Sequence, residues 1–126
     1  MIRVRYYSGR TPPAPFVNLV VYPVGEPLRS LNFSAQIDTA ADRTVVPQSI
    51  IDTLAIPSVG SVLVQGFGGH SQQISLFPIV LKLTPLPAYR LTVAAHPDES
   101  FILLGRDFLN HFLIVLDGPS EIVEFS

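Results

Sequence analysis

Prolines and glycines divide this chain into short pieces, and this limits its possible folds more than any other feature of the sequence. The 126 residues include 12 prolines and 8 glycines. Because proline cannot continue a helix and glycine weakens one, this punctuation favours short strands over long helices. The clearest turn sequences lie at 11–13, 23–25, 84–87 and 117–119.

One apolar run has the alternation of a strand. Leu31, Phe33, Ala35 and Ile37 alternate with polar residues and lead directly to Asp38. A period of two is typical of a half-buried strand. Further apolar or alternating runs occur at 16–22, 61–65, 74–83, 91–95, 112–116 and 121–125. Many short strands in a small chain predict an all-β fold whose antiparallel sheet closes into a barrel.

Two short helices are also expected. Pro47 suits the first helical position of one, which ends before Pro57 because proline blocks its continuation. Asp107 suits the cap of the other. The side chains expected to face inward are Ile50, Ile51 and Leu54 in the first helix and Phe108, Leu109 and Phe112 in the second.

Composition indicates one folded domain over residues 1–126. Hydrophobic residues make up 48% and charged residues 14% of the chain, a balance opposite to that of disordered proteins. No apolar run approaches the roughly 18 residues that a membrane span needs. The first residues also lack the apolar region of a signal peptide, so neither a membrane partner nor export is expected.

The chain contains no cysteine, which excludes disulfides, thiolate catalysis and cysteine-based metal sites. This fits a reducing compartment, and we expect a cytoplasmic protein. The formal net charge of −2 gives no reason to expect a nucleic acid as partner. Arg3, Arg5 and Arg10 form the single basic cluster, which we interpret as a solvated strand edge.

Asp38 is the strongest candidate for a functional residue. It ends an apolar strand and is followed by Thr39 and Ala40, an arrangement that suits a carboxylate held by backbone and hydroxyl donors at the mouth of a cleft. A plain turn is the competing interpretation, because Asp and Thr are common turn residues. The Asp52–Thr53 pair shows that two such residues alone are not diagnostic, since the helical pattern explains them.

Two glycine features follow at a distance. Gly66, Phe67, Gly68 and Gly69 lie between two predicted strands, where glycines permit the positive φ of a hairpin tip. A phosphate-binding loop would need a following helix and usually a lysine, and neither is present. The second feature is an apolar run over 101–104 that ends at Gly105.

The order and spacing of these three segments resemble the retropepsin-like aspartic proteases. The resemblance covers roughly residues 31–125. It implies a closed β-barrel with one or two short helices. It also implies that Asp38 is catalytic and that residues 66–69 belong to a flap that closes over a bound peptide.

The resemblance also implies supporting roles around the catalytic residue. Arg106 would pair with Asp42, and Gly105 would let its strand pass close behind the loop. Thr39 would join the loops of two subunits through hydrogen bonds. Ala40 stands where the family usually has glycine; it keeps the amide N–H, but at a positive φ its Cβ would cost about 1–2 kcal/mol.

Single-domain members of the family bring one aspartate from each of two chains, so the resemblance implies a homodimer. Two Asp38 carboxylates held close together would share one proton. The ionised one would take a proton from water, which attacks a peptide carbonyl polarised by the protonated one. The expected activity is hydrolysis of peptides or proteins without a metal or other cofactor. The interface is expected at Ile2, Val4, Val123 or Phe125.

Two other interpretations stay open. The same fold could serve as a catalytically impaired module for peptide binding or dimerisation, or the chain could be an unrelated β-barrel with a chance Asp-Thr-small triplet. A zinc site is not indicated, because His70, His96 and His111 lack the spacing of a local motif. The nucleophile elbow of serine hydrolases is also missing.

Overall fold

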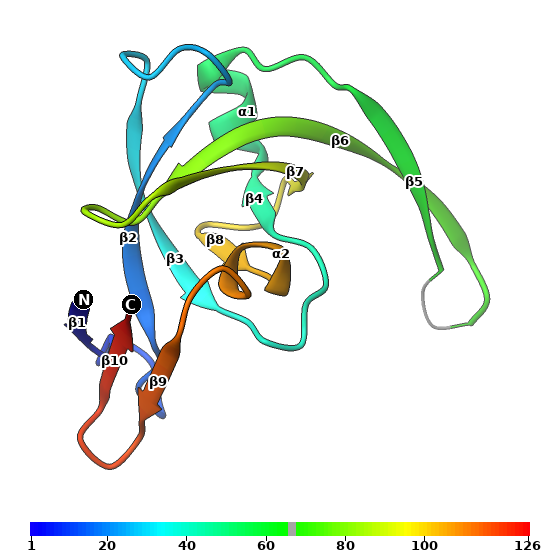
Figure 1. Ribbon diagram of the computed structural model, residues 1–126. Coiled ribbons are helices and arrows are strands. Elements are labelled where there is room, and N and C mark those ends of the chain that lie inside the picture. Colours follow the sequence, from blue (N-terminus) through cyan, green and yellow to red (C-terminus); the bar gives the residue numbers. More distant parts are fainter. Residues whose placement is uncertain (66–67) are drawn as a thin grey trace.

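The computed structural model describes residues 1–65 and 68–126, which form short strands and two short helices (Figure 1). The elements in chain order are β1 (Ile2–Arg5), β2 (Phe16–Tyr22), β3 (Leu31–Ile37), β4 (Val45–Pro47), α1 (Gln48–Leu54), β5 (Gly60–Gln65), β6 (Ser71–Lys82), β7 (Ala88–His96), β8 (Ile102–Leu104), α2 (Arg106–Leu109), β9 (Ile114–Asp117) and β10 (Ile122–Phe125).

The main sheet closes into a ring, which confirms the predicted all-β barrel. Its strands follow the order β2, β3, β8, β4, β7, β6, and β6 pairs again with β2 (Figure 1). Most neighbours are antiparallel, as expected. However, β8 runs parallel to β3 and β4 runs parallel to β7. Although β3 and β4 are consecutive in the chain, they do not form a hairpin, because β8 inserts between them.

A smaller sheet brings the two ends of the chain together (Figure 1). Its order is β1, β10, β9, with Ile2 opposite Phe125. The expectation that Val123 or Phe125 pairs with a partner chain is wrong, because β10 is paired on both sides within the chain. Both side chains are also fully buried. The free edges of this sheet are those of β1 and β9.

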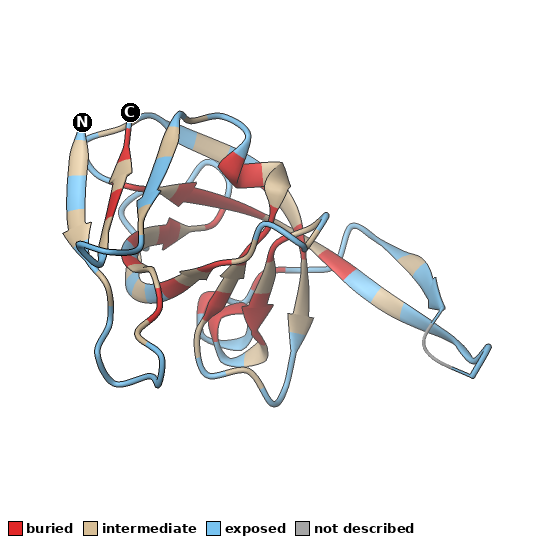
Figure 2. Ribbon diagram, turned by 90° about the horizontal axis from the view of Figure 1, so that it is seen from below, coloured by how far each residue is buried: buried red, intermediate tan, exposed pale blue. Residues whose placement is uncertain are grey.

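The buried residues follow the strands of the ring (Figure 2). The helix α1 contacts β4 and β7. Ile50, Ile51 and Leu54 are buried, as predicted. Pro47, however, is the last residue of β4 and the N-cap of α1 rather than its first helical residue. Neither helix of the described chain is long and apolar enough to cross a membrane.

The second helix begins differently from the prediction. Its N-cap is Gly105, and Asp107 lies inside the first turn, so the prediction of Asp107 as the cap is wrong. Phe108 and Leu109 are buried as expected. Phe112 lies beyond the end of the helix and is half-buried against the core. The carboxylate of Asp107 is available for another partner because it does not cap the helix.

Candidate active site

Asp38 leaves the end of β3 at the point where this strand pairs with β8. Its backbone N–H donates to the carbonyl of Leu104 at 3.0 Å, which fixes the start of the loop to the barrel. The backbone N–H of Ala40 donates to Asp38 Oδ1 at 3.1 Å. The half-buried carboxylate is therefore held by a backbone donor of its own loop. A plain turn makes the same local bond, so the surroundings of the loop decide what it can do.

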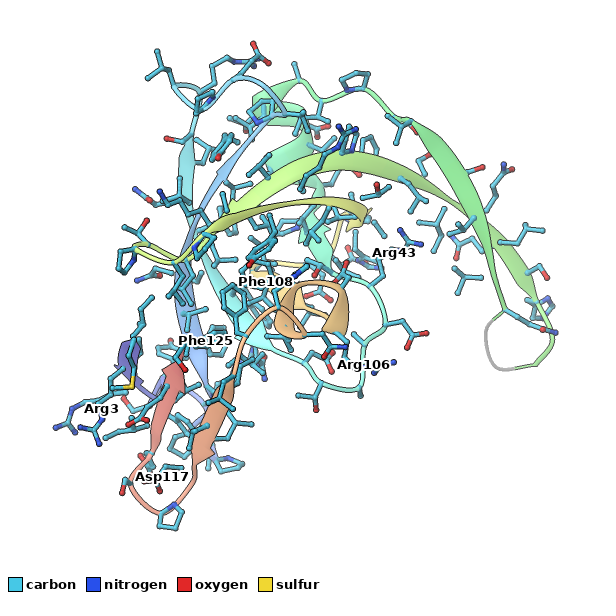
Figure 3. All side chains as sticks on the ribbon, in the orientation of Figure 1. Arg3, Arg43, Arg106, Phe108, Asp117 and Phe125 are labelled. Atoms are coloured by element: carbon cyan, nitrogen blue, oxygen red, sulfur yellow. The ribbon has the colours of Figure 1, made fainter. Side chains whose placement is uncertain are left out.

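Arg106 ties this loop to α2. Its Nη1 donates to the carbonyl of Thr39 at 2.7 Å, and its Nη2 forms an ion pair with Asp42 Oδ1. Its backbone N–H donates to the carbonyl of Ala41 at 2.9 Å. Figure 3 shows the Arg106 side chain directed from α2 to the loop. The expected Arg106–Asp42 pair is thus present, and the same residue fixes the loop at three points.

Gly105 allows this contact because of its small size. A Cβ built on Gly105 would lie 2.7 Å from the carbonyl carbon of Arg43 and 2.9 Å from the backbone nitrogen of Thr44. Backbone atoms cannot move aside as the end of a flexible side chain can. The chain therefore passes backbone to backbone behind the loop, which is the close approach that the sequence suggested for this glycine.

A hydrogen-bond network that no sequence motif indicated lies behind the loop. The Thr44 N–H donates to both carboxylate oxygens of Asp107 at 3.0 Å, and Thr44 Oγ1 donates to Oδ1 at 2.7 Å. Thr44 Oγ1 also accepts from the backbone N–H of Gly105 at 3.1 Å. Thr44 and Asp107 are 63 positions apart in the sequence, so no local pattern could have revealed their contact.

Thr39 and Ala40 lie at the exposed tip of the loop. Among the residues that the structure describes, the non-glycine positions with positive φ are Ala55 and Glu121. Ala40 is therefore free of the backbone strain that a positive φ would impose. Its amide donates to Asp38, so alanine at this position keeps the bond that glycine would make.

The hairpin of β5 and β6 projects from the barrel (Figures 1 and 2). Its strands pair antiparallel up to Gln65 opposite Ser71. Gly68 and Gly69 have φ angles of 87° and 78°, which suit glycine at a hairpin tip. The other two predicted flap residues, Gly66 and Phe67, lie outside the described residues.

Two of the three histidines lie at or just beyond the ends of secondary-structure elements. The ring of His111 stacks on Tyr89 with centroids 3.8 Å apart, beyond the end of α2, and His96 ends β7. Within residues 1–65 and 68–126, no group of three or more His, Cys, Asp or Glu side chains has the arrangement of a metal site.

No protein-family model and no characterised protein sequence matches this chain. Its structure is similar to a retropepsin-like aspartic protease from Rickettsia conorii, with a TM-score of 0.68, 11% identity and coverage of 98% of this chain and 88% of the other. EIAV protease in complex with the inhibitor HBY-793 aligns with a TM-score of 0.59 and 17% identity over 78% of this chain and 86% of the other. The retroviral protease-like domain of Ddi1 from Leishmania major aligns with a TM-score of 0.54 and 13% identity over 90% of this chain and 88% of the other. At these identities the similarities establish the fold alone, and that fold is retropepsin-like, as predicted.

Proposed function

We propose that this chain is an aspartic endopeptidase that acts as a homodimer, with Asp38 of each subunit in the active site. The observation that carries the proposal is the anchored loop. The Asp38 carboxylate accepts from the amide of Ala40, and Arg106 and Gly105 hold the loop against the barrel. The similar solved structures, one named as a protease and one as a retropepsin-like aspartic protease, support the same chemistry.

The proposed reaction needs two copies of Asp38 facing each other. Like charges this close do not both ionise, so the pair holds one proton between its two carboxyl groups. The ionised group removes a proton from water, and the water oxygen attacks the peptide carbonyl. The protonated group donates to the carbonyl oxygen as the tetrahedral intermediate forms. Water is the nucleophile, so the protein forms no covalent bond with the substrate.

Two exposed parts of the molecule have roles in this proposal. The hydroxyl of Thr39, at the loop tip, bonds across the twofold axis and keeps the two loops in register. The hairpin of β5 and β6 covers the bound peptide and excludes water. Leu63 and Val64 on this hairpin are 75% and 44% exposed. They are neighbours on β5 and point to opposite faces, so the closed hairpin would bury one of them against substrate.

We place the dimer interface at the outer edge of β9. An unprotected edge strand pairs readily with another chain, whereas charged side chains discourage such pairing. Arg3 and Arg5 are exposed on β1, the opposite edge of the same small sheet. By contrast, Val115 and Leu116 on β9 are 45% and 47% exposed. Pairing of β9 with its copy would extend the sheet and bury these side chains.

Peptide cleavage tests the proposal. A mixture of unstructured peptides is incubated at mildly acidic pH with the wild type and with Asp38→Asn, and products are identified by mass spectrometry. Asp52→Asn is a matched control, because Asp52 precedes a threonine on the exposed side of α1. We expect cleavage by the wild type and the control but not by Asp38→Asn. Cleavage that survives in Asp38→Asn would remove this residue from the mechanism.

A non-catalytic peptide-binding or dimerisation module is the second candidate function. The observation that favours it is the exposed Cβ of Ala40 at the loop tip, where the proposed substrate would approach. A wild-type protein that sediments as a dimer, binds peptides and leaves all of them intact would support this second function instead of hydrolysis.

A further inference from the structure

The segment after β1 folds back over the barrel and borders a cavity that is open to solvent. Tyr7 and Ala14 pair through two backbone hydrogen bonds, of 2.7 and 3.1 Å, that close the loop between them. Between this segment, β2, β3 and the residues before β8 lies a space of about 680 Å³. Sites for small organic molecules have volumes of roughly 300–1,000 Å³. Asp38 does not line this space, so it is separate from the proposed catalytic loop.

Three aromatic rings form one wall of this cavity. Tyr7 packs edge to face on Phe16 with centroids 5.2 Å apart, and Phe16 packs in the same way on Phe101 at 5.1 Å. Tyr7 and Phe16 lie at the two ends of one short loop, whereas Phe101 comes from a distant part of the chain. The three rings offer an aromatic wall, partly covered by the Arg10 guanidinium, against which a flat or apolar group can pack.

Two arginines give the cavity its charge. Arg5 and Arg10 both line it, and none of the lining side chains is acidic. The guanidinium carbon of Arg10 lies 4.8 Å from the ring centroid of Phe101 and 5.7 Å from that of Phe16. In the described part of the chain, the ion pairs with carboxylates are made by Arg3, Arg29 and Arg106. Within residues 1–65 and 68–126, neither cavity arginine has such a counterion.

We propose that this cavity binds an organic anion that carries a carboxylate or phosphate group on an apolar or aromatic body. The guanidinium groups of Arg5 and Arg10 match the planar oxygens of such an anion and bind them through charge-assisted hydrogen bonds. The three-ring wall takes the body of the ligand. Asn18 and Ser34, which also line the cavity, add an amide and a hydroxyl for further polar contacts. This site is independent of whether the chain hydrolyses peptides.

Calorimetric titration with four probes tests the ligand class. The probes are 2-naphthoate, 2-naphthyl phosphate, the neutral 2-naphthamide and inorganic phosphate. We expect saturable binding of at least one of the two aromatic anions, and added salt should weaken it. Whichever of 2-naphthoate and 2-naphthyl phosphate binds more tightly shows whether the site prefers a carboxylate or a phosphate. The amide lacks the charge and inorganic phosphate lacks the body, so both should bind at least about tenfold more weakly. No saturable binding of either aromatic anion, or equal binding of the amide, would overturn the proposal.

Substitutions locate the site. Arg5→Gln and Arg10→Gln should each weaken binding of the better anion by about tenfold, because each removes a charge-assisted hydrogen bond. Arg3→Gln is the matched control, since Arg3 lies on the same strand as Arg5 but pairs with Glu124 at 2.9 Å and does not line the cavity. Equal losses in all three variants would indicate nonspecific attraction to positive charge. Unchanged binding in Arg5→Gln and Arg10→Gln would also reject the site.

Discussion

Thr44 and Asp107 are joined by three hydrogen bonds although they are 63 residues apart. Thr44 is fully buried, and its hydroxyl both donates to the carboxylate and accepts from the amide of Gly105. The contact joins the segment after the Asp38 loop to the first turn of α2. It therefore fixes the frame on which the proposed catalytic residue stands.

Replacing Thr44 should destabilise this frame. Thr44→Val keeps the shape of the side chain but leaves the Gly105 amide without its acceptor and Asp107 without one donor. Asp107 keeps the N–H groups of Thr44 and Phe108 as donors, so the Gly105 amide is the buried group left unsatisfied. Such a group costs about 1–3 kcal/mol, and we expect a loss of that size in the free energy of unfolding. Urea denaturation measures this change. Thr53→Val, at an exposed position of α1, should alter stability little. Equal effects at the two positions would contradict the importance of the network.

Gly105→Ala should be destabilising for a different reason. The added Cβ would meet backbone atoms of Arg43 and Thr44 at 2.7 and 2.9 Å, so one segment must shift. Overpacking of this kind costs about 1–3 kcal/mol. Gly118→Ala is the control, because a Cβ there would meet nothing within 4 Å. Urea denaturation that shows no loss of stability in Gly105→Ala would mean that the two segments are less tightly packed than the structure indicates.

The barrel could be predicted because its signals are local. The runs at 16–22 and 31–37 correspond to β2 and β3 in both bounds, since alternation over seven residues specifies a strand and its buried face. The buried face of α1 could be predicted for the same reason. A strand of three residues such as β4 gives little periodic signal. Its formation depends on pairing with β7 and β8.

Long-range contacts explain what the sequence could not supply at the site. The capping rule assigned Asp107 to the start of a helix, but its carboxylate binds Thr44, which comes from another part of the chain. The pairing of Val123 and Phe125 within their own chain depends on where β1 and β9 lie. The Arg106–Asp42 pair was expected only because the motifs resemble a known family, not because spacing required it.

The proposed interface at β9 predicts a change in association. Leu116→Lys places a charge among the exposed apolar side chains of this edge, and desolvating that charge on pairing is unfavourable. We expect sedimentation to show a dimer for the wild type at high concentration and a monomer for the variant. Leu28→Lys is the control, because Leu28 is 98% exposed between β2 and β3. A Leu116→Lys protein that stays dimeric would move the interface elsewhere.

Ala40→Gly separates strain in the loop from crowding of the substrate. Ala40 has no positive φ, so glycine gains nothing in the folded state and adds freedom to the unfolded one. We expect a loss of about 0.4–1 kcal/mol in stability. Ala55→Gly should do the opposite and stabilise the chain by about 1 kcal/mol, because Ala55 has the left-handed conformation at the end of α1.

Ala40→Gly should lower the stability and Ala55→Gly should raise it, so urea denaturation of both variants tests whether the backbone at Ala40 is strained. A stabilising Ala40→Gly would show that the loop is strained after all. The rate of hydrolysis then tests whether Ala40 crowds the substrate. The amide that donates to Asp38 is present in both the wild type and Ala40→Gly, so the two proteins differ there only in the methyl group. If the Cβ of Ala40 crowds the peptide, Ala40→Gly should raise the rate of hydrolysis while lowering stability. Identical rates in the two proteins would show that the methyl group does not touch the substrate.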